Sequence, residues 1–167
     1  MTRRQVLAVS AAAAVVAAGG VGGVASQWWN RPADEGYTWL SEEEVSFVEA
    51  LADALFPPGG QPALAGADAQ LSRWFDEVLG TLPPGKAREF KLLLHALDAL
   101  GSVQGGGRFA SQDRTERWRL ARSWITSPIP ELRGASLGLS TLLGGGYTTH
   151  PEVAEFFSQW HGCGYGR

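Results

Sequence analysis

Clusters of proline and glycine divide the chain after Leu40 into segments of helical length. Between these clusters, apolar residues recur every three or four positions, which is the spacing of one helix face, and no stretch sustains the alternation of a strand. Proline lacks the amide hydrogen that inner helical turns require, and glycine is favoured at helix ends. We therefore predict an all-α fold, a compact bundle of about five to six helices over residues 40–167. The clusters are Pro57-Pro58-Gly59-Gly60, Pro83-Pro84-Gly85, Gly105-Gly106-Gly107, Pro128 with Pro130, and Gly144-Gly145-Gly146.

The first three expected helices differ in how they start and in how apolar they are. Ser41 and Glu44 have the spacing of a capping box at the start of the first helix. The second is expected over about residues 68–79 and the third over about residues 86–103. Because Phe90 and several leucines cover most of the circumference of the third helix, we expect it at the centre of the core.

Three further helices complete the expected domain. Ser111 is predicted to cap the fourth helix, and Pro151 to open the last one at a first-turn position. Gly105-Gly106-Gly107 and Gly144-Gly145-Gly146 each follow an apolar helical pattern rather than a strand, so they are not expected to be phosphate-binding loops. We interpret both triplets as left-handed helix ends.

The N-terminus has the layout of a bacterial export signal. Arg3 and Arg4 form a short basic head, and residues 6–25 are uncharged and mostly Ala, Val and Gly. The adjacent arginine pair is typical of the twin-arginine signal, which a receptor recognises as an address. Residues 1–25 are therefore predicted to be a twin-arginine export signal, either cleaved before Ser26 or retained as a membrane anchor.

Residues 26–39 show no helical period and are predicted to be a linker or arm. The pair Trp28-Trp29 is unusual in a solvated linker. It would lie at the membrane interface beside an uncleaved anchor, or dock on another protein surface.

The overall charge argues against nucleic acid as a partner. The full chain has a net charge of −3, and residues 1–25 carry two arginines and no acid, so the remainder has a net charge of −5. Nucleic-acid binding requires a basic face. One arginine run forms a locally basic patch, either solvated or paired with an acidic partner surface; it consists of Arg108, Arg114, Arg117, Arg119 and Arg122.

Few residues indicate catalysis or a bound cofactor. The histidines have no metal-ligand spacing on one helix. His95, in the most apolar segment, is interpreted as a hydrogen-bonded core histidine, and His150, before Pro151, as a turn or cap residue. Cys163 cannot form a zinc site alone, and no C-x-x-C-H haem motif occurs. We predict no catalytic, cofactor-binding or metal site in this chain.

An ordered set of motifs runs through residues 40–153. The most specific is Ala50-Leu51-Ala52-Asp53-Ala54-Leu55-Phe56-Pro57. The others are Leu40-Ser41-Glu42-Glu43-Glu44, Leu82-Pro83-Pro84, Ala96-Leu97-Asp98-Ala99-Leu100, Arg108-Phe109 and Gly146-Tyr147-Thr148-Thr149-His150-Pro151-Glu152-Val153. In this order they resemble the gluconate 2-dehydrogenase subunit 3 family, the small subunits of bacterial membrane-associated flavin dehydrogenases of the GMC type.

This resemblance implies a non-catalytic subunit without a cofactor of its own. The implied partner is a large subunit that binds FAD and oxidises an alcohol, sugar or sugar acid, with a cytochrome c subunit to pass electrons to the quinone pool. The small subunit would help the flavoprotein mature and carry it by the twin-arginine route to the periplasm or the outer face of the cytoplasmic membrane. The alternative is a stand-alone exported helical binding protein without an enzyme partner.

Aromatic residues near both ends are the expected partner contacts, because they lie on terminal elements with little core to enter. They are Trp28, Trp29, Phe156, Phe157 and Trp160. Cys163 is either an inert thiol or the site of a disulfide bond to the partner, since an exported protein meets an oxidising compartment.

Overall fold

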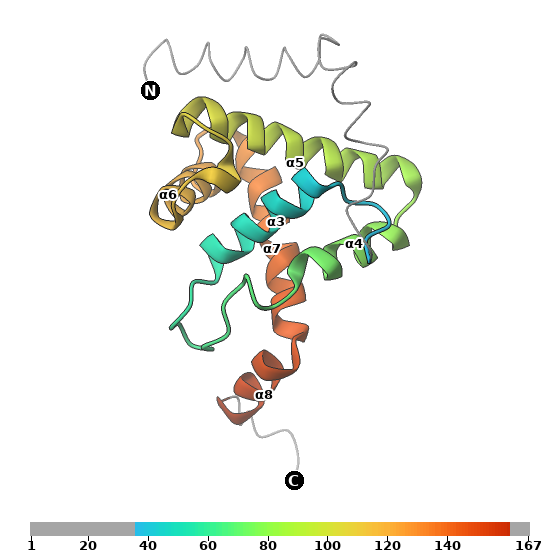
Figure 1. Ribbon diagram of the computed structural model, residues 1–167, viewed down its shortest axis with the longest axis vertical. Helices are drawn as coiled ribbons and strands as arrows, with labels where there is room; N and C mark the ends of the chain where they lie inside the picture. The colour runs from blue at the N-terminus through green and yellow to red at the C-terminus, as the bar shows by residue number, and fades with distance from the viewer. Residues whose placement is uncertain (1–35, 161–167) are drawn as a thin grey trace.

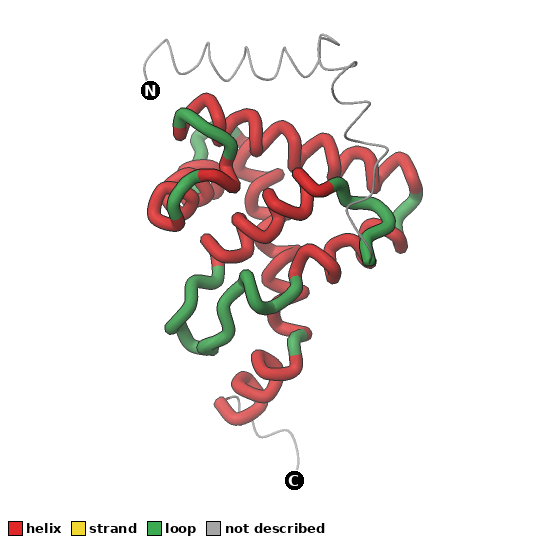
Figure 2. Tube along the Cα trace, in the orientation of Figure 1, coloured by secondary structure: helices red, strands yellow, loops and turns green. Residues whose placement is uncertain are grey.

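The computed structural model describes residues 36–160, and this part of the chain is all-α, without strands (Figure 1). Figure 2 shows the helices joined by short loops, apart from a longer connection after the first of them. The predicted all-α bundle is confirmed. None of the helices in this range is long and apolar enough to cross a membrane. The elements are α3 (Glu42–Leu55), α4 (Leu71–Thr81), α5 (Pro84–Gly105), the 3-10 turn η1 (Phe109–Ser111), α6 (Arg114–Ile125), α7 (Pro130–Thr149) and α8 (Pro151–Trp160).

Helix α3 lies at the centre of the bundle and packs against α4, α5, α6 and η1 (Figure 1). Its start is the predicted capping box: Glu44 N donates to the Ser41 hydroxyl, and Ser41 N donates to the Glu44 carboxylate. Phe47 and Val48 are fully buried. Phe47 lies 5.1 Å, centroid to centroid, from Phe109 of η1. The core is thus built around α3.

The prediction that the third helix occupies the centre is wrong. Helix α5 buries one side, which includes Leu94 and Leu97. Its other side exposes Leu92 at 40% and Val103 at 63%. Apolar residues therefore occupy two sides of α5, and the described part of the chain covers only one of them.

Two predicted helix starts are corrected. The second helix begins at Leu71 rather than residue 68, because Gln70 has a positive φ of 50° that interrupts the helical backbone. Ser111 does not cap the fourth helix: it lies in η1. Asp113 caps α6 instead, by accepting a hydrogen bond of 2.9 Å from the backbone N of Glu116. Asp113 lies two residues after Ser111 and is also a favoured N-cap residue, so the sequence did contain a signal for this helix start.

The two glycine triplets behave differently. Gly106 has a φ of 78° and ends α5 in the left-handed conformation, as predicted. The second triplet lies inside α7, so the interpretation of it as a helix end is wrong. Gly146 allows a close approach there, because a Cβ at this position would lie 2.6 Å from ring atoms of Trp74 in α4.

The connection between α3 and α4, residues 56–70, is held by α7 and by the end of α3. The Tyr147 hydroxyl of α7 donates to the Leu64 carbonyl at 2.6 Å. The Tyr147 ring stacks on Phe56 at a centroid distance of 4.1 Å. Beyond this point α8 extends from the end of α7, opened by Pro151 as predicted, and buries Val153 (Figure 1).

Candidate functional site

A buried ionic cluster joins α3 to α5. The Glu44 side chain, 1% exposed, lies 3.2 Å from Lys91 Nζ and 2.8 Å from His95 Nε2. Lys91 also donates to the Trp39 carbonyl, and Ser41 N donates to Glu44 Oε2, the same oxygen that faces Lys91. His95 is hydrogen-bonded as predicted, to Glu44 Oε1, but its side chain is 21% exposed and lies at the edge of the core rather than inside it. Because its groups bond one another, this cluster fixes the start of α3 rather than presenting chemistry to a ligand.

A second carboxylate, Asp76 of α4, holds the chain just before α3. Its two oxygens accept hydrogen bonds from the backbone N atoms of Thr38, Trp39 and Leu40, at 2.9, 2.8 and 2.7 Å. Nearby, the hydroxyls of Tyr37 and Ser72 lie 2.8 Å apart. We call residues 37–41 and the side chains that hold them the entry clamp. It fixes the backbone that leads into α3.

Asp53 of α3 binds two arginines of α6. Arg114 donates from Nε and Nη2 to the Asp53 carboxylate, and Arg117 Nη2 lies 2.9 Å from it. The hydrogen bonds that Arg114 donates to Asp53 raise the pKa of Arg114 above its ordinary value. The Asp53 side chain is only 8% exposed, so the pair of arginines neutralises a carboxylate at the α3–α6 contact.

The arginine run is therefore only partly available to a partner. Arg119 pairs with Glu116, and this hydrogen bond lowers the pKa of Glu116 and raises that of Arg119. Arg108 lies 3.4 Å from Asp98. Arg122 alone in the run has no ion pair within the described part of the chain. Sequence spacing did not reveal these pairs, since the acids that bind Arg108, Arg114 and Arg117 lie on other helices.

An open pocket of about 280 Å³ lies between the end of α3 and the first half of α6. Its walls are mostly apolar, and Trp118, 43% exposed, forms one of them. The lining residues are Ala54, Leu55, Pro57, Arg114, Thr115 and Trp118. Such a pocket can take an apolar side chain beside a guanidinium group. We refer to it as the Trp118 pocket.

The Trp118 pocket was not predicted from the sequence, where Trp118 is one of several apolar residues between Arg114 and Ile125. The signal was present in the helical period. Leu120, Ala121 and Trp124 lie on one face and are buried. Trp118 lies six positions before Trp124, about 120° away around the helix. It therefore cannot share that face.

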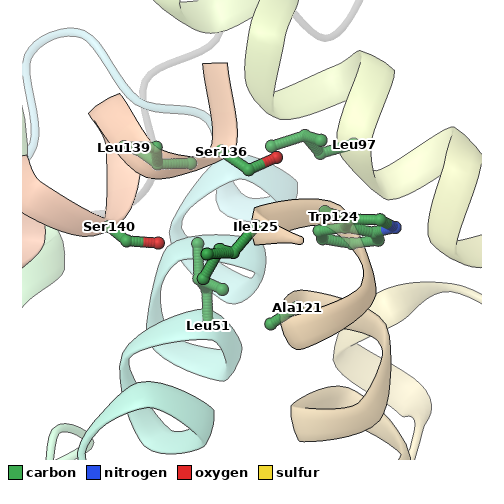
Figure 3. Close-up of a pocket in the computed structure, with 8 residues that line it drawn as sticks. All are labelled: Leu51, Leu97, Ala121, Trp124, Ile125, Ser136, Leu139 and Ser140. Carbon is green, nitrogen blue, oxygen red and sulfur yellow. The ribbon is translucent and has the colours of Figure 1, made fainter. Parts of the chain in front are cut away.

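A smaller cavity lies inside the bundle, where α3, α5, α6 and α7 meet (Figure 3). Trp124, Leu51 and Leu139 point into this seam. Ser136 also lines it, and its buried hydroxyl has no hydrogen-bond partner among the described residues. The cavity has no room for a water molecule. It is a gap in packing and not a ligand site.

The structure describes only some of the remaining predicted site residues. Phe156 and Phe157 are half-buried on α8, with their rings edge-to-face at 5.5 Å, and Phe157 packs against the core. His150 acts at the helix junction, where its carbonyl accepts from Ala154 N. Several predictions lie outside the described residues: Arg3, Arg4, Trp28, Trp29, the Trp160 side chain and Cys163.

Within residues 36–160, no group of three or more His, Cys, Asp or Glu side chains could hold a metal ion. No family model, no curated protein and no solved structure matches this chain.

Proposed function

We propose that this chain is the small subunit of an exported, FAD-dependent dehydrogenase of the GMC type that acts on an alcohol or sugar. In this proposal the large subunit holds FAD and performs the oxidation. The small subunit binds it, helps it mature and supplies the twin-arginine signal that takes the folded complex to the periplasm or the outer face of the cytoplasmic membrane.

The observation that carries the proposal is that the motifs resembling this family contact one another. Asp53, in the most specific motif, binds α6, and the adjacent Phe56 stacks on Tyr147 of the last motif. Asp98, in the leucine-rich motif, accepts from the backbone N of Phe109 in the Arg108-Phe109 motif. Residues scattered over the sequence thus form one framework. A shared framework is what distant members of a family would retain.

The signal and the domain have complementary roles in this proposal. Twin-arginine export carries proteins that are already folded, and a flavoprotein must fold around its FAD before export. A subunit with the signal can therefore export a partner that lacks one, provided that the two bind in the cytoplasm.

The proposal predicts that a large flavin dehydrogenase without its own export signal is encoded beside this chain. It is tested by changing Arg3 and Arg4 to lysine in cells that produce both proteins. The change keeps both charges but removes the planar donor group of arginine. We expect the partner to accumulate in the cytoplasm with its FAD, measured by fractionation and flavin fluorescence. Arg88→Lys, an exposed change within the domain, is the control and should leave export intact.

Normal export of the flavoprotein in the double-lysine variant would contradict the proposal. So would a flavin bound at about one per chain in the purified small subunit alone. A failure of the two proteins to co-purify would favour the stand-alone binding protein instead.

A further inference from the structure

The outer face of α6 combines an apolar pocket with unused positive charge. Arg114 and Arg122 lie one helical turn before and one turn after Trp118, and all three side chains are exposed. Arg114 binds Asp53 through Nε and Nη2, while its Nη1 donates no hydrogen bond within residues 36–160. In the same range Arg122 forms no ion pair. Trp118 thus has a guanidinium group one helical turn away in each direction: Arg114 lines the pocket itself, and Arg122 lies beyond it.

The spacing of these groups defines what could bind. Arg114 and Arg122 are eight residues apart, which is about 12 Å along a helix. An extended peptide covers that distance in about four residues. A segment with two carboxylates about four positions apart would reach both arginines, and its middle residue would face Trp118. The pocket of about 280 Å³ accommodates an apolar side chain at that point.

We propose that the Trp118 pocket binds an extended acidic segment of the flavoprotein, with an apolar residue midway between two carboxylates. This inference rests on the proposed function. Charge argues for such an occupant, because its carboxylates would accept hydrogen bonds from Arg114 Nη1 and from the Arg122 guanidinium. Trp and Arg are also the residues that most often dominate binding energy at interfaces.

Charge also argues against a second copy of this chain at the pocket. A symmetric dimer would place the same patch on both subunits, so Arg122 of one copy would face the arginines of the other copy and the charges would repel. Nucleic acid is disfavoured because Asp113 and Glu116 lie on the same helix end and the domain is acidic overall.

The first test uses a dye-labelled synthetic peptide that carries two glutamates four positions apart and a leucine midway. Fluorescence anisotropy measures its binding to the purified chain. We expect Trp118→Ala and Arg122→Glu each to weaken binding about tenfold or more. Arg88→Glu, an exposed arginine of α5, is the matched control and should bind like the unchanged protein. Added salt should weaken binding, since the pairs are exposed.

Two results with the peptide would overturn the proposal: equal binding by the Trp118→Ala variant, or equal binding of a peptide with lysines in place of the glutamates. Thermal unfolding of each variant shows that the fold is retained. Trp118 and Arg122 lie on the surface, so the unfolding midpoints should remain close to that of the unchanged chain.

The second test separates this inference from the proposed function. The chain and the flavin dehydrogenase that the proposed function predicts as its partner are produced together, and the complex is captured through a tag on the flavoprotein. A complex that is lost in Trp118→Ala and Arg122→Glu but kept in Arg88→Glu supports both proposals. A complex equally stable in all variants would disprove the docking surface and leave the subunit role standing. No complex with the unchanged chain would disprove the subunit role, and with it the flavoprotein as occupant.

Discussion

At the scale of single residues, the buried charges of this domain serve to hold backbone in place. Glu44 bonds Ser41 N and lies against Lys91 and His95, while Lys91 reaches the Trp39 carbonyl. A buried ion is costly without a partner, so each member of such a cluster depends on the others. The glutamates in the first turn of α3 therefore contribute unequally to the stability of the domain.

We expect Glu44→Gln to destabilise the domain by about 3 kcal/mol, because it leaves the buried Lys91 ammonium without its counter-ion. Glu42→Gln, in the same first turn but exposed, is the matched control and should change the free energy of unfolding by less than about 0.5 kcal/mol. Urea unfolding followed by circular dichroism gives both values. Equal losses would show that the first-turn charge, and not the cluster, is what matters.

Tyr147 should make the domain sensitive to alkali. Burial raises the pKa of its phenol above the ordinary value near 10. The unfolded chain therefore ionises first, so stability is intact below about pH 10 and declines as the pH rises above it. Tyr147→Phe should cost about 1 kcal/mol at neutral pH, through the lost bond to the Leu64 carbonyl, and should remove part of the alkaline decline. Thermal melts from pH 8 to about pH 11 test this prediction; Tyr37→Phe, a less buried tyrosine, is the comparison.

At the scale of helices, periodicity and breaks were enough to predict the order of the six α-helices within residues 36–160, although not the turn η1. Local signals located α3 and α8 well, because the capping box at Ser41 and Pro151 at a helix start act through neighbouring residues. The cap of α6 was missed although a local signal, Asp113, was present, but the other errors arose where distant contacts decide. Gly146 makes room for the ring of Trp74 rather than ending a helix, and the role of Asp53 depends on arginines about sixty residues later. The helical period of α6 sets Trp118 apart from Trp124, but the pocket itself also needs α3, so that period alone does not define it.

The glycines of α7 provide a matched pair of substitutions. Gly145→Ala should stabilise the domain by about 0.5–1 kcal/mol, because its Cβ would meet no atom within 4 Å and alanine favours the helix. Gly146→Ala should destabilise it by about 1–3 kcal/mol, since its Cβ would lie 2.6 Å from the Trp74 ring. Chemical unfolding of both variants gives the two changes in the free energy of unfolding. Stabilisation by both changes would mean that Trp74 moves aside without loss.

At the scale of the whole molecule, residues 36–160 leave apolar surface uncovered on the outer side of α5. Leu92 and Val103 are exposed, and Ala96 and Ala99 lie between them at the helical spacing that places all four on one side. A sequence pattern that is apolar all round predicted burial on every side. The described residues cover only one side of α5, so the other side is available for association.

We expect the isolated chain over residues 26–167 to self-associate through this side of α5. Replacing both Leu92 and Val103 with glutamine should shift the sedimentation profile toward monomer and leave the unfolding midpoint nearly unchanged, because neither side chain is buried. Leu94→Gln, on the buried side of the same helix, should instead unfold the domain. Unchanged association in the double variant would place the contact elsewhere.

The entry clamp also has a consequence for the order in which the protein is made. Residues 38–40 are held by Asp76, and the Trp39 carbonyl by Lys91, 52 residues later in the chain. Synthesis proceeds from the N-terminus, so the first residues of the domain leave the ribosome well before the side chains that will hold them. The beginning of this domain is consequently secured only when α5 has emerged. Until then, the backbone of residues 38–40 lacks part of the side-chain bonding that holds it in the folded domain, so the entry clamp closes only after α3 and α4 have both been made.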